Sequence, residues 1–168
     1  GMVQKRCFHD RASKVPLIFS YPGVFKEEKR ISRLVSLIDL FPTLADMVGG
    51  YSPKDLPGIS LLRGIKSDAD IPDRTVFCEY HGEGVHAPCF MAREGNFKYI
   101  YVHGHEELLY DIKNDPQELD NVIDDPNNSN IVRKLKSAVL DRFNPDLIAL
   151  NGLQRQQNRR YILNSYNF

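Results

Sequence analysis

Residues 89–102 read CFMAREGNFKYIYV, and the expected architecture can be built outward from this stretch. Two runs rich in β-forming residues flank Glu94-Gly95-Asn96, which is the pattern of a β-hairpin closed by a short loop that contains glycine. In the second run every other side chain is aromatic, so one face of that strand is expected to lie in a core. These aromatic residues are Phe97, Tyr99 and Tyr101.

The segments around the hairpin extend it into a small antiparallel sheet covered by a helix. Residues 75–80 and 108–111 are further β-rich runs, which predict two more strands. Residues 129–143 carry apolar side chains at helical spacing, and Pro145 ends the pattern. Residues 115–118 read DPQE, with an aspartate as cap and a proline at the first position, and so predict the start of a short helix.

The first part of the chain predicts a different layer. Residues 15–19 (VPLIF) form an apolar run that ends at Pro22-Gly23, which is typical of a buried strand followed by a turn. Residues 37–48 carry the apolar stripe of an amphipathic helix, and Gly49-Gly50 supplies a left-handed stop. Residues 51–73 are rich in proline, glycine and serine and predict a long ordered loop with one helical turn. The predicted fold class is α+β.

The composition is that of a folded domain and argues against nucleic acid or a membrane as partner. The chain has 168 residues, of which 42% are hydrophobic and 10% aromatic. Lys plus Arg and Asp plus Glu both number 22, whereas a binder of nucleic acid or anionic membranes usually carries a basic excess. No apolar run approaches the roughly 20 residues that a membrane-spanning helix needs. The three cysteines lack metal-ligand spacing and are expected to be buried free thiols.

Reactive side chains are densest after the predicted strand at 75–80. His81, Glu83 and His86 follow it, and the two glycines beside Glu83 allow unusual backbone angles. Loops at strand ends often carry binding groups, so these three residues are candidate substrate contacts. A flexible connection with two exposed histidines is the plain alternative. Zinc binding by the same side chains has no recognised ligand pattern behind it.

Other polar groups allow simpler interpretations. The segment His103-Gly104-His105 lies between predicted strands and is interpreted as a solvated turn rather than a metal site. Lys5 and Arg6 carry donors for sulfate or phosphate oxygens, although charge alone does not separate that role from a surface position. Residues 146–166 predict a last helix, whose arginines form a solvated face or pair with acidic groups across a homo-oligomer interface.

Five segments, in order along the chain, resemble the sulfatase family. The first has a lysine, an aromatic residue and then K-V-P-L-I, close to R-V-P-L-I in the family. The second is similar to the helix V-S-x-x-D-x-x-P-T-L, and the third to L-x-G-x-S-L-L. The last two resemble the closing patterns K-Y-I with L-Y-D, and D-P-x-E-x-x-N. In the same order as these patterns, the segments are residues 4–18, 36–44, 56–62, 97–111 and 115–121.

The resemblance implies an alkaline-phosphatase-like fold, in which a large α/β domain holds the active site and a smaller C-terminal sheet-and-helix domain completes it. Residues 1–73 would be the tail end of the large domain, and residues 74–168 the C-terminal subdomain. The chain would then be the C-terminal part of a sulfuric ester hydrolase and inactive by itself.

The catalysis that the resemblance implies depends mostly on polypeptide before residue 1. Family members cleave sulfate esters with a formylglycine made from the Cys or Ser of a C/S-x-P-x-R motif, beside a divalent metal that is usually calcium. None of the three cysteines starts such a motif, so this nucleophile is not expected in the chain. The resemblance also implies that the metal-binding Asp-Asp pair and the later Asp-Asn/His-Gly segment lie before residue 1, so no metal ligand is expected in the chain. Only Lys5 matches a family catalytic position, where it would bind a sulfate oxygen and stabilise charge on the leaving oxygen. His9-Asp10 replaces the usual aromatic-glutamate pair, and Lys14 replaces arginine.

The resemblance leaves the substrate open. Residues 79–84 and 154–160 look most like choline sulfatases, and Glu83 is the acidic group that a choline ammonium would need. An aryl sulfate, a sugar sulfate, and a phosphonate or phosphodiester substrate are the other candidates. A cytoplasmic location is favoured only by the choline-type likeness. A stand-alone, non-catalytic interaction domain is the alternative outside the enzymes.

Overall fold

The structure, a computed structural model, describes residues 7–66, 71–82 and 84–166. Its contacts divide the chain into two units. The larger unit combines the chain up to Lys14 with Phe77–Phe168, and the smaller unit is Val15–Val76. The predicted boundary between residues 73 and 74 refers to the domains of a longer enzyme and stays a prediction.

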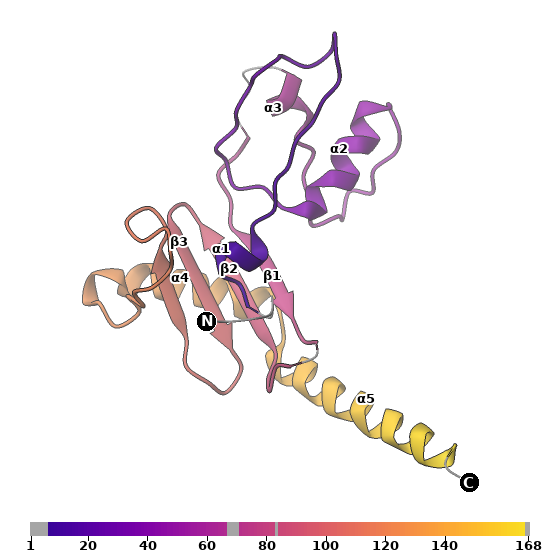
Figure 1. Cartoon of the computed structure of the whole chain (residues 1–168), viewed down its shortest axis with the longest axis vertical. Helices are drawn as coiled ribbons and strands as arrows, with labels where there is room; N and C mark the ends of the chain where they lie inside the picture. The colour runs from indigo at the N-terminus through magenta and orange to yellow at the C-terminus, as the bar shows by residue number, and fades with distance from the viewer. Residues whose placement is uncertain (1–6, 67–70, 83, 167–168) are drawn as a thin grey trace. The chain divides into compact units, whose positions relative to one another are not determined.

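A four-stranded sheet organises the larger unit, with its strands in the order β1-β2-β3-β4 (Figure 1). The hairpin of β2 and β3 is antiparallel with Glu94 opposite Phe97, and β4 pairs antiparallel with β3. Gly95 takes a φ of +54° in the loop, a conformation that suits glycine. The predicted strands are therefore confirmed. They are β1 (Val76–Tyr80), β2 (Cys89–Glu94), β3 (Phe97–Val102) and β4 (Leu108–Asp111).

Helix α4 (Ser129–Arg142) covers one face of this sheet. Tyr99 of β3 is fully buried there against Leu135 and Val139 of the helix. Phe97 and Tyr101 pack against the same cluster, as the alternation in β3 predicts. The aromatic face is thus the core of the larger unit, and the helix predicted over 129–143 is confirmed.

The opposite face of the sheet carries the N-terminal segment. Phe8 is 6% exposed and packs with Met91, Ile100 and Tyr110. A single helical turn, α1 (Asp10–Ser13), follows it. The Ser13 hydroxyl donates to the Phe8 carbonyl oxygen at 2.8 Å, which closes this turn. The segment that begins at Phe8 is therefore bound to strand β3, 90 residues further along the chain.

The smaller unit contains the helices predicted for it. A 3₁₀ turn, η1 (Leu37–Asp39), leads into α2 (Leu40–Met47), and Gly49 ends the helix with a φ of +66°. The helical turn expected within residues 51–73 is α3 (Leu62–Lys66). The core of the unit consists of Leu61, Ile65 and Ile71.

Two predicted elements are wrong. Residues 15–19 form no strand. Leu17 and Phe19 pack against the small core while Ile18 is 86% exposed, so the side chains alternate as in a strand. A strand also needs a hydrogen-bonded neighbour, and in the described part of the chain no strand lies beside these residues.

The helix predicted to start at residues 115–118 is instead a turn. The Asp115 carboxylate accepts the backbone N–H groups of Leu119 at 2.6 Å and Asp120 at 2.9 Å. Glu118 adopts a φ of +58°, which is incompatible with a right-handed helix. The aspartate therefore caps a loop, in competition with helix formation.

The last helix, α5 (Pro145–Ser165), projects from the sheet unit (Figure 1). The Asn144 side chain accepts the N–H of Leu147 at 3.0 Å, and Pro145 occupies the first turn, which explains the start of the helix. Only Pro145 is buried along it. A homo-oligomer through this helix stays a prediction. Among the helices of the described residues, none combines the length and apolar character that a membrane crossing requires.

We expect Gly58→Ala to destabilise the smaller unit by roughly 1–3 kcal/mol, the scale of overpacking. A Cβ at this position would fall far inside van der Waals distance of the Ile38 backbone. Gly50→Ala is the control, because its Cβ would make only ordinary contacts of 3.4 Å or more, and we expect a change below about 0.5 kcal/mol. Urea unfolding of the purified variants measures both. Equal urea midpoints for Gly58→Ala and Gly50→Ala would contradict the close packing of Gly58 against the Ile38 backbone.

Candidate functional site

The structure describes two of the four sequence-predicted site residues. Lys5 and Glu83 lie outside the described residues. His81 directly follows β1, and its Nε2 lies 3.0 Å from Oε2 of Glu79. His86 is exposed in the loop that leads to β2. The two histidines therefore share one loop, and their role as substrate contacts stays a prediction.

The His81 imidazole lies at the surface between an aromatic ring and a carboxylate. Its ring packs against the core residue Phe90 with 5.0 Å between ring centroids, and its side chain remains 30% exposed. A partly exposed imidazole beside a carboxylate can exchange hydrogen bonds with a polar ligand. This chemistry suits substrate binding and requires no metal.

The described residues bring together no group of three His, Cys, Asp or Glu side chains that could hold a metal ion. His103 lies 3.4 Å from Asp146 through Nε2 and 3.4 Å from the Tyr101 hydroxyl through Nδ1. Gly104 has a φ of +72°, and residues 103–105 form the turn predicted for them. The described part of the chain thus offers no ligand set that fits the calcium expected from the family.

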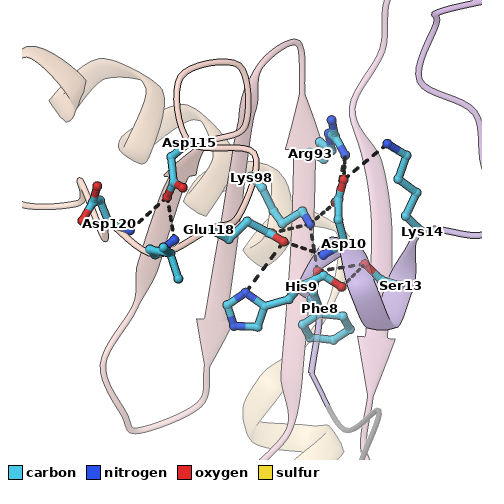
Figure 2. A network of polar contacts seen from close by, with 11 residues as sticks. Phe8, His9, Asp10, Ser13, Lys14, Arg93, Lys98, Asp115, Glu118 and Asp120 are labelled. Carbon is cyan, nitrogen blue, oxygen red and sulfur yellow. Dashed lines mark hydrogen bonds and ion pairs between the residues drawn. The ribbon is translucent and has the colours of Figure 1, made fainter. Parts of the chain in front are cut away.

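A connected polar cluster joins residues 8–10 to the sheet (Figure 2). The Lys98 side chain on β3 is 1% exposed. Its ammonium group donates to the Phe8 carbonyl oxygen at 2.9 Å, to Oε1 of Glu118 at 2.6 Å and to Oδ1 of Asp10. All three donors of the group are thereby used. A buried ammonium group needs such partners, because an unpaired charge in apolar surroundings is far more costly than a lost neutral hydrogen bond.

Asp10 is a second centre of the same cluster. Its carboxylate also accepts from Nη1 of Arg93 at 3.2 and 3.5 Å, and Nζ of Lys14 lies 3.7 Å away. Burial alone would raise the pKa of the Asp10 carboxyl. The hydrogen bond and charge of Lys98, together with the charges of Arg93 and Lys14, outweigh burial and hold this pKa below its ordinary value. Asp10 is therefore ionised at neutral pH.

Glu118 connects the cluster to the backbone of α1. Its Oε2 accepts the backbone N–H of Asp10 at 2.5 Å, and its side chain is 2% exposed. Its positive φ is uncommon for a residue other than glycine. Such a conformation persists where neighbouring bonds enforce it, and the turn held by Asp115 supplies them. That turn directs the glutamate at the N-terminal segment, as Figure 2 shows.

A separate buried carboxylate organises the smaller unit. Asp39 is fully buried, accepts the N–H of Ile59 at 2.9 Å and pairs with Arg74. Thr43, also fully buried, accepts the N–H of Leu61 at 2.9 Å. The sulfatase-like segments 36–44 and 56–62 are thus hydrogen-bonded to each other, and their polar residues serve the fold.

Sequence reasoning did not single out Lys98, Glu118 or the bonding of Asp10. One signal was available, because Lys98 alternates with the aromatic residues and so shares a strand face with the apolar side chains of Ile100 and Val102. A lysine at such a position predicts a buried acidic partner. The sequence offers 22 acidic residues and no means of choosing among them, because the partners lie 88 and 20 residues away.

Residues 1–144 match the family described as N-sulphoglucosamine sulphohydrolase, C-terminal. The chain belongs to this family of sulfatase C-terminal domains. The match includes the smaller unit and the larger unit up to the residue before α5. It also includes Asp10, Lys98 and Glu118, so the buried cluster lies inside the sulfatase domain.

Curated relatives extend the match to named sulfatases. Delta 4,5-hexuronate-2-O-sulfatase of Bacteroides thetaiotaomicron is 38% identical over an alignment of 144 residues, and the match covers 81% of this chain and 29% of that protein. Arylsulfatase K of Homo sapiens is 34% identical over an alignment of 128 residues, and the match covers 70% of this chain and 24% of that protein. The chain therefore spans less than a third of the length of these relatives. Neither of them is a choline sulfatase.

Solved structures show the same sheet and helices. A 2-O GAG sulfatase superposes with a TM-score of 0.53 at 38% identity, covering 62% of this chain and 23% of that chain. A phosphonate monoester hydrolase of Agrobacterium radiobacter gives a TM-score of 0.51 at 25% identity, covering 66% of this chain and 25% of that chain. The predicted α+β class is confirmed, as the C-terminal part of a sulfatase structure.

We expect Asp10→Asn to lower the free energy of unfolding by roughly 1.5–3 kcal/mol at neutral pH, the scale of hydrogen bonds to a charged group. The pKa of Asp10 is lowered on folding from an ordinary value of 3.8, so the carboxylate contributes fully above that pH. Its contribution is lost as the pH falls through the lowered value. The penalty of the substitution should therefore be constant from about pH 5 to 7 and shrink in acid.

Urea unfolding across this pH range measures the penalty. Asp141→Asn, an exposed position on α4, controls for the removal of one carboxylate and should change the free energy by less than about 0.5 kcal/mol. If the Asp10→Asn penalty grew on acidification, folding would have to raise the pKa of Asp10, which contradicts the lowered pKa described above.

Proposed function

We propose that the chain is the C-terminal part of a sulfuric ester hydrolase, in which it completes the pocket around the sulfate group. The observation that carries the proposal is the 38% identity to a hexuronate sulfatase over 144 residues. The five sulfatase-like segments all fall within the family match at residues 1–144. Because the chain covers only 29% of that relative, the activity of the whole protein is part of the proposal.

The exposure of α2 supports a larger enzyme around this chain. Phe41 is 57% exposed and Leu44 52%, whereas Asp39 and Thr43 on the same helical segment are fully buried. A helix of a self-contained domain normally buries its apolar stripe and exposes its polar face. The reversed arrangement is expected if the apolar stripe of residues 37–48 packs against further sulfatase polypeptide.

Lys5 is the residue of this chain that we assign to catalysis. Its ammonium group would donate to a sulfate oxygen and stabilise the negative charge that develops on the leaving oxygen. Such a donor acts through its position, because it lowers the barrier only when it is aimed at the charge of the transition state. His81, Glu83 and His86 are assigned to the substrate side of the pocket.

The nucleophile and the metal are assigned to the remaining polypeptide. In sulfatases formylglycine supplies the nucleophile, and calcium supplies positive charge to the sulfate group. Because the described residues contain no three-ligand set, this chain is assigned no step of that chemistry. Its contribution is electrostatic and positional.

A sugar sulfate is the substrate class that we favour. The support is the similarity to a protein named for 2-O-sulfated hexuronate, which exceeds the 34% identity to arylsulfatase K. Choline sulfate is the second candidate. Its support is the likeness of residues 79–84 to choline sulfatases, with Glu83 as the acidic group for the choline ammonium. Hydrolysis of each sulfate ester by the full-length protein separates them, and faster turnover of choline sulfate would overturn this preference.

A phosphonate monoester hydrolase is the alternative activity. The observation that favours it is the similar fold of the Agrobacterium radiobacter enzyme at 25% identity. A non-catalytic interaction domain is the alternative outside the enzymes, and an open reading frame upstream of Met2 that lacks C/S-x-P-x-R would support it.

We expect the full-length protein to hydrolyse a sulfate ester and the 168-residue chain alone to show no turnover, even with calcium added. The isolated chain lacks a formylglycine motif, so the nucleophile is missing. Release of inorganic sulfate from matched substrate solutions measures both. Turnover by the isolated chain would overturn the assignment, and release from the phosphonate analogue alone would favour the alternative activity.

We expect Lys5→Ala in the full-length enzyme to lower kcat by roughly 10²–10³, the scale seen when one transition-state donor is removed. Lys29→Ala is the control, because it removes an ammonium group from a region that we do not assign to the site. Steady-state kinetics at saturating substrate measure the effect. An unchanged kcat for Lys5→Ala would remove Lys5 from the catalytic machinery.

A further inference from the structure

Glu79 and His81 form a polar pair at the end of strand β1. Glu79 shares a strand face with Phe77, which packs in the core beneath helix α4. Nε2 of His81 lies 3.0 Å from Oε2 of Glu79. An ionised carboxylate only accepts hydrogen bonds, so Nε2 carries the hydrogen and donates it. The pair thereby fixes the tautomer of the neutral imidazole, in which Nδ1 is an acceptor.

The neighbours of His81 hold its ring in place. The ring packs against Phe90, which is fully buried, with 5.0 Å between the ring centroids. A Cβ at Gly82 would lie 2.9 Å from the Tyr80 hydroxyl oxygen, so the Tyr80 ring lies directly against this glycine. The Tyr80 side chain packs in the cluster on the other face of the sheet. His81 therefore lies between two anchored residues, and its orientation is set before a ligand binds.

Nδ1 of His81 is available to a ligand. No described residue forms a hydrogen bond with this nitrogen, and the His81 side chain is 30% exposed. The Glu79 side chain is 53% exposed. An exposed pair of this kind contributes little to stability, because water competes for both partners. Stability therefore gives little reason for the pair, whereas an oriented acceptor at a strand end is of use to a binding site.

An oriented acceptor selects a ligand that carries a donor. Sugar sulfates keep hydroxyl groups next to the sulfate ester, and each of them can donate a hydrogen bond. Choline sulfate and 4-nitrophenyl sulfate have no O–H or N–H group. Nδ1 of His81 can thus form a hydrogen bond with a sugar sulfate that these other two esters cannot form, and such a bond discriminates between substrates.

We propose that Nδ1 of His81 accepts a hydrogen bond from a hydroxyl group of a sugar sulfate, and that Glu79 is the positioning residue that holds the required tautomer. The proposal rests on the proposed function, because it requires His81 to face the substrate of a sulfatase. It gives the preference for a sugar over choline a physical cause. Neither Lys5 nor Glu83 takes part in it.

The kinetics of the full-length enzyme on two sulfate esters test the role of His81. One probe is an unsaturated hexuronate disaccharide with a 2-O-sulfate, and the other is 4-nitrophenyl sulfate. Assays at pH 8 lie above the range in which imidazole ordinarily titrates. We expect His81→Ala to lower kcat/KM for the disaccharide roughly 3–10-fold, mainly through KM, which is the scale of one hydrogen bond between neutral groups. The value for 4-nitrophenyl sulfate should change less than about twofold, because that ester has no donor for Nδ1.

Substitutions of Glu79 test the positioning role. Glu79→Ala removes the acceptor of the Nε2 hydrogen, so we expect it to lower kcat/KM for the disaccharide by roughly the same factor. In the His81→Ala background the same change should have an effect below about twofold, because the positioned ring is already gone. Glu79→Gln keeps an acceptor oxygen and should stay within about twofold of the unsubstituted enzyme.

Asp146→Asn is the matched control. Asp146 is also an exposed carboxylate next to a histidine, since its Oδ1 lies 3.4 Å from Nε2 of His103. We do not assign this second pair to the site, so both kcat/KM values should stay within about twofold. Thermal unfolding should give nearly the same midpoint for every variant, because both pairs are exposed.

Four outcomes overturn the proposal and leave the proposed function intact. They are an equal loss on both esters, no loss on the disaccharide, a loss from Glu79→Ala that persists without His81, and hydrolysis of 4-nitrophenyl sulfate by an unsubstituted enzyme that does not hydrolyse the disaccharide. If the unsubstituted enzyme releases sulfate from neither ester, the proposed function is overturned as well.

Discussion

The larger unit depends on one ammonium group that is removed from water. Lys98 is on the face of β3 opposite helix α4, where it satisfies all its donors with a backbone carbonyl and two carboxylates from distant parts of the chain. Once a charge is buried in this way, the loss of one partner leaves a donor of the ammonium group without its acceptor in a site closed to water, which is costly. The N-terminal segment, the hairpin and the turn at Glu118 are therefore held as one arrangement.

The smaller unit is also organised around a buried charged side chain, but here the charge is negative. Asp39 is the buried group, and the amide of Ile59 and the guanidinium group of Arg74 satisfy it. Gly58 is required next to it because a side chain there would meet the Ile38 backbone. In both units the polar residues of the sulfatase-like segments thus join pieces of chain that are far apart in sequence, and this explains how a domain without a nucleophile can share such specific patterns with enzymes.

The division of labour within the proposed enzyme follows from this arrangement. The described residues offer a restrained segment at residues 8–10, a loop with two histidines, and a helix, α2, whose apolar side chains are exposed. Among the residues that the structure describes, no three His, Cys, Asp or Glu side chains come together as ligands for a metal ion. Within the proposed enzyme, the role of such a chain is to complete the pocket, and the bonds that fix residues 8–10 on the sheet are the most restrained part of it that the structure describes.

Local patterns were sufficient to predict the hairpin, the aromatic face of β3, and helices α2, α4 and α5, because the spacing of apolar residues and the glycine and proline signals act between near neighbours. The same reasoning gave a strand at residues 15–19 and a helix at 115–118, and both are absent. A strand requires a partner that local sequence does not specify, and Asp115 bonds the amides that a helix would have used. The pairing of Lys98 with Asp10 and Glu118 could be read only from the folded chain, since a buried charge selects its partners by distance in space and not by distance in sequence.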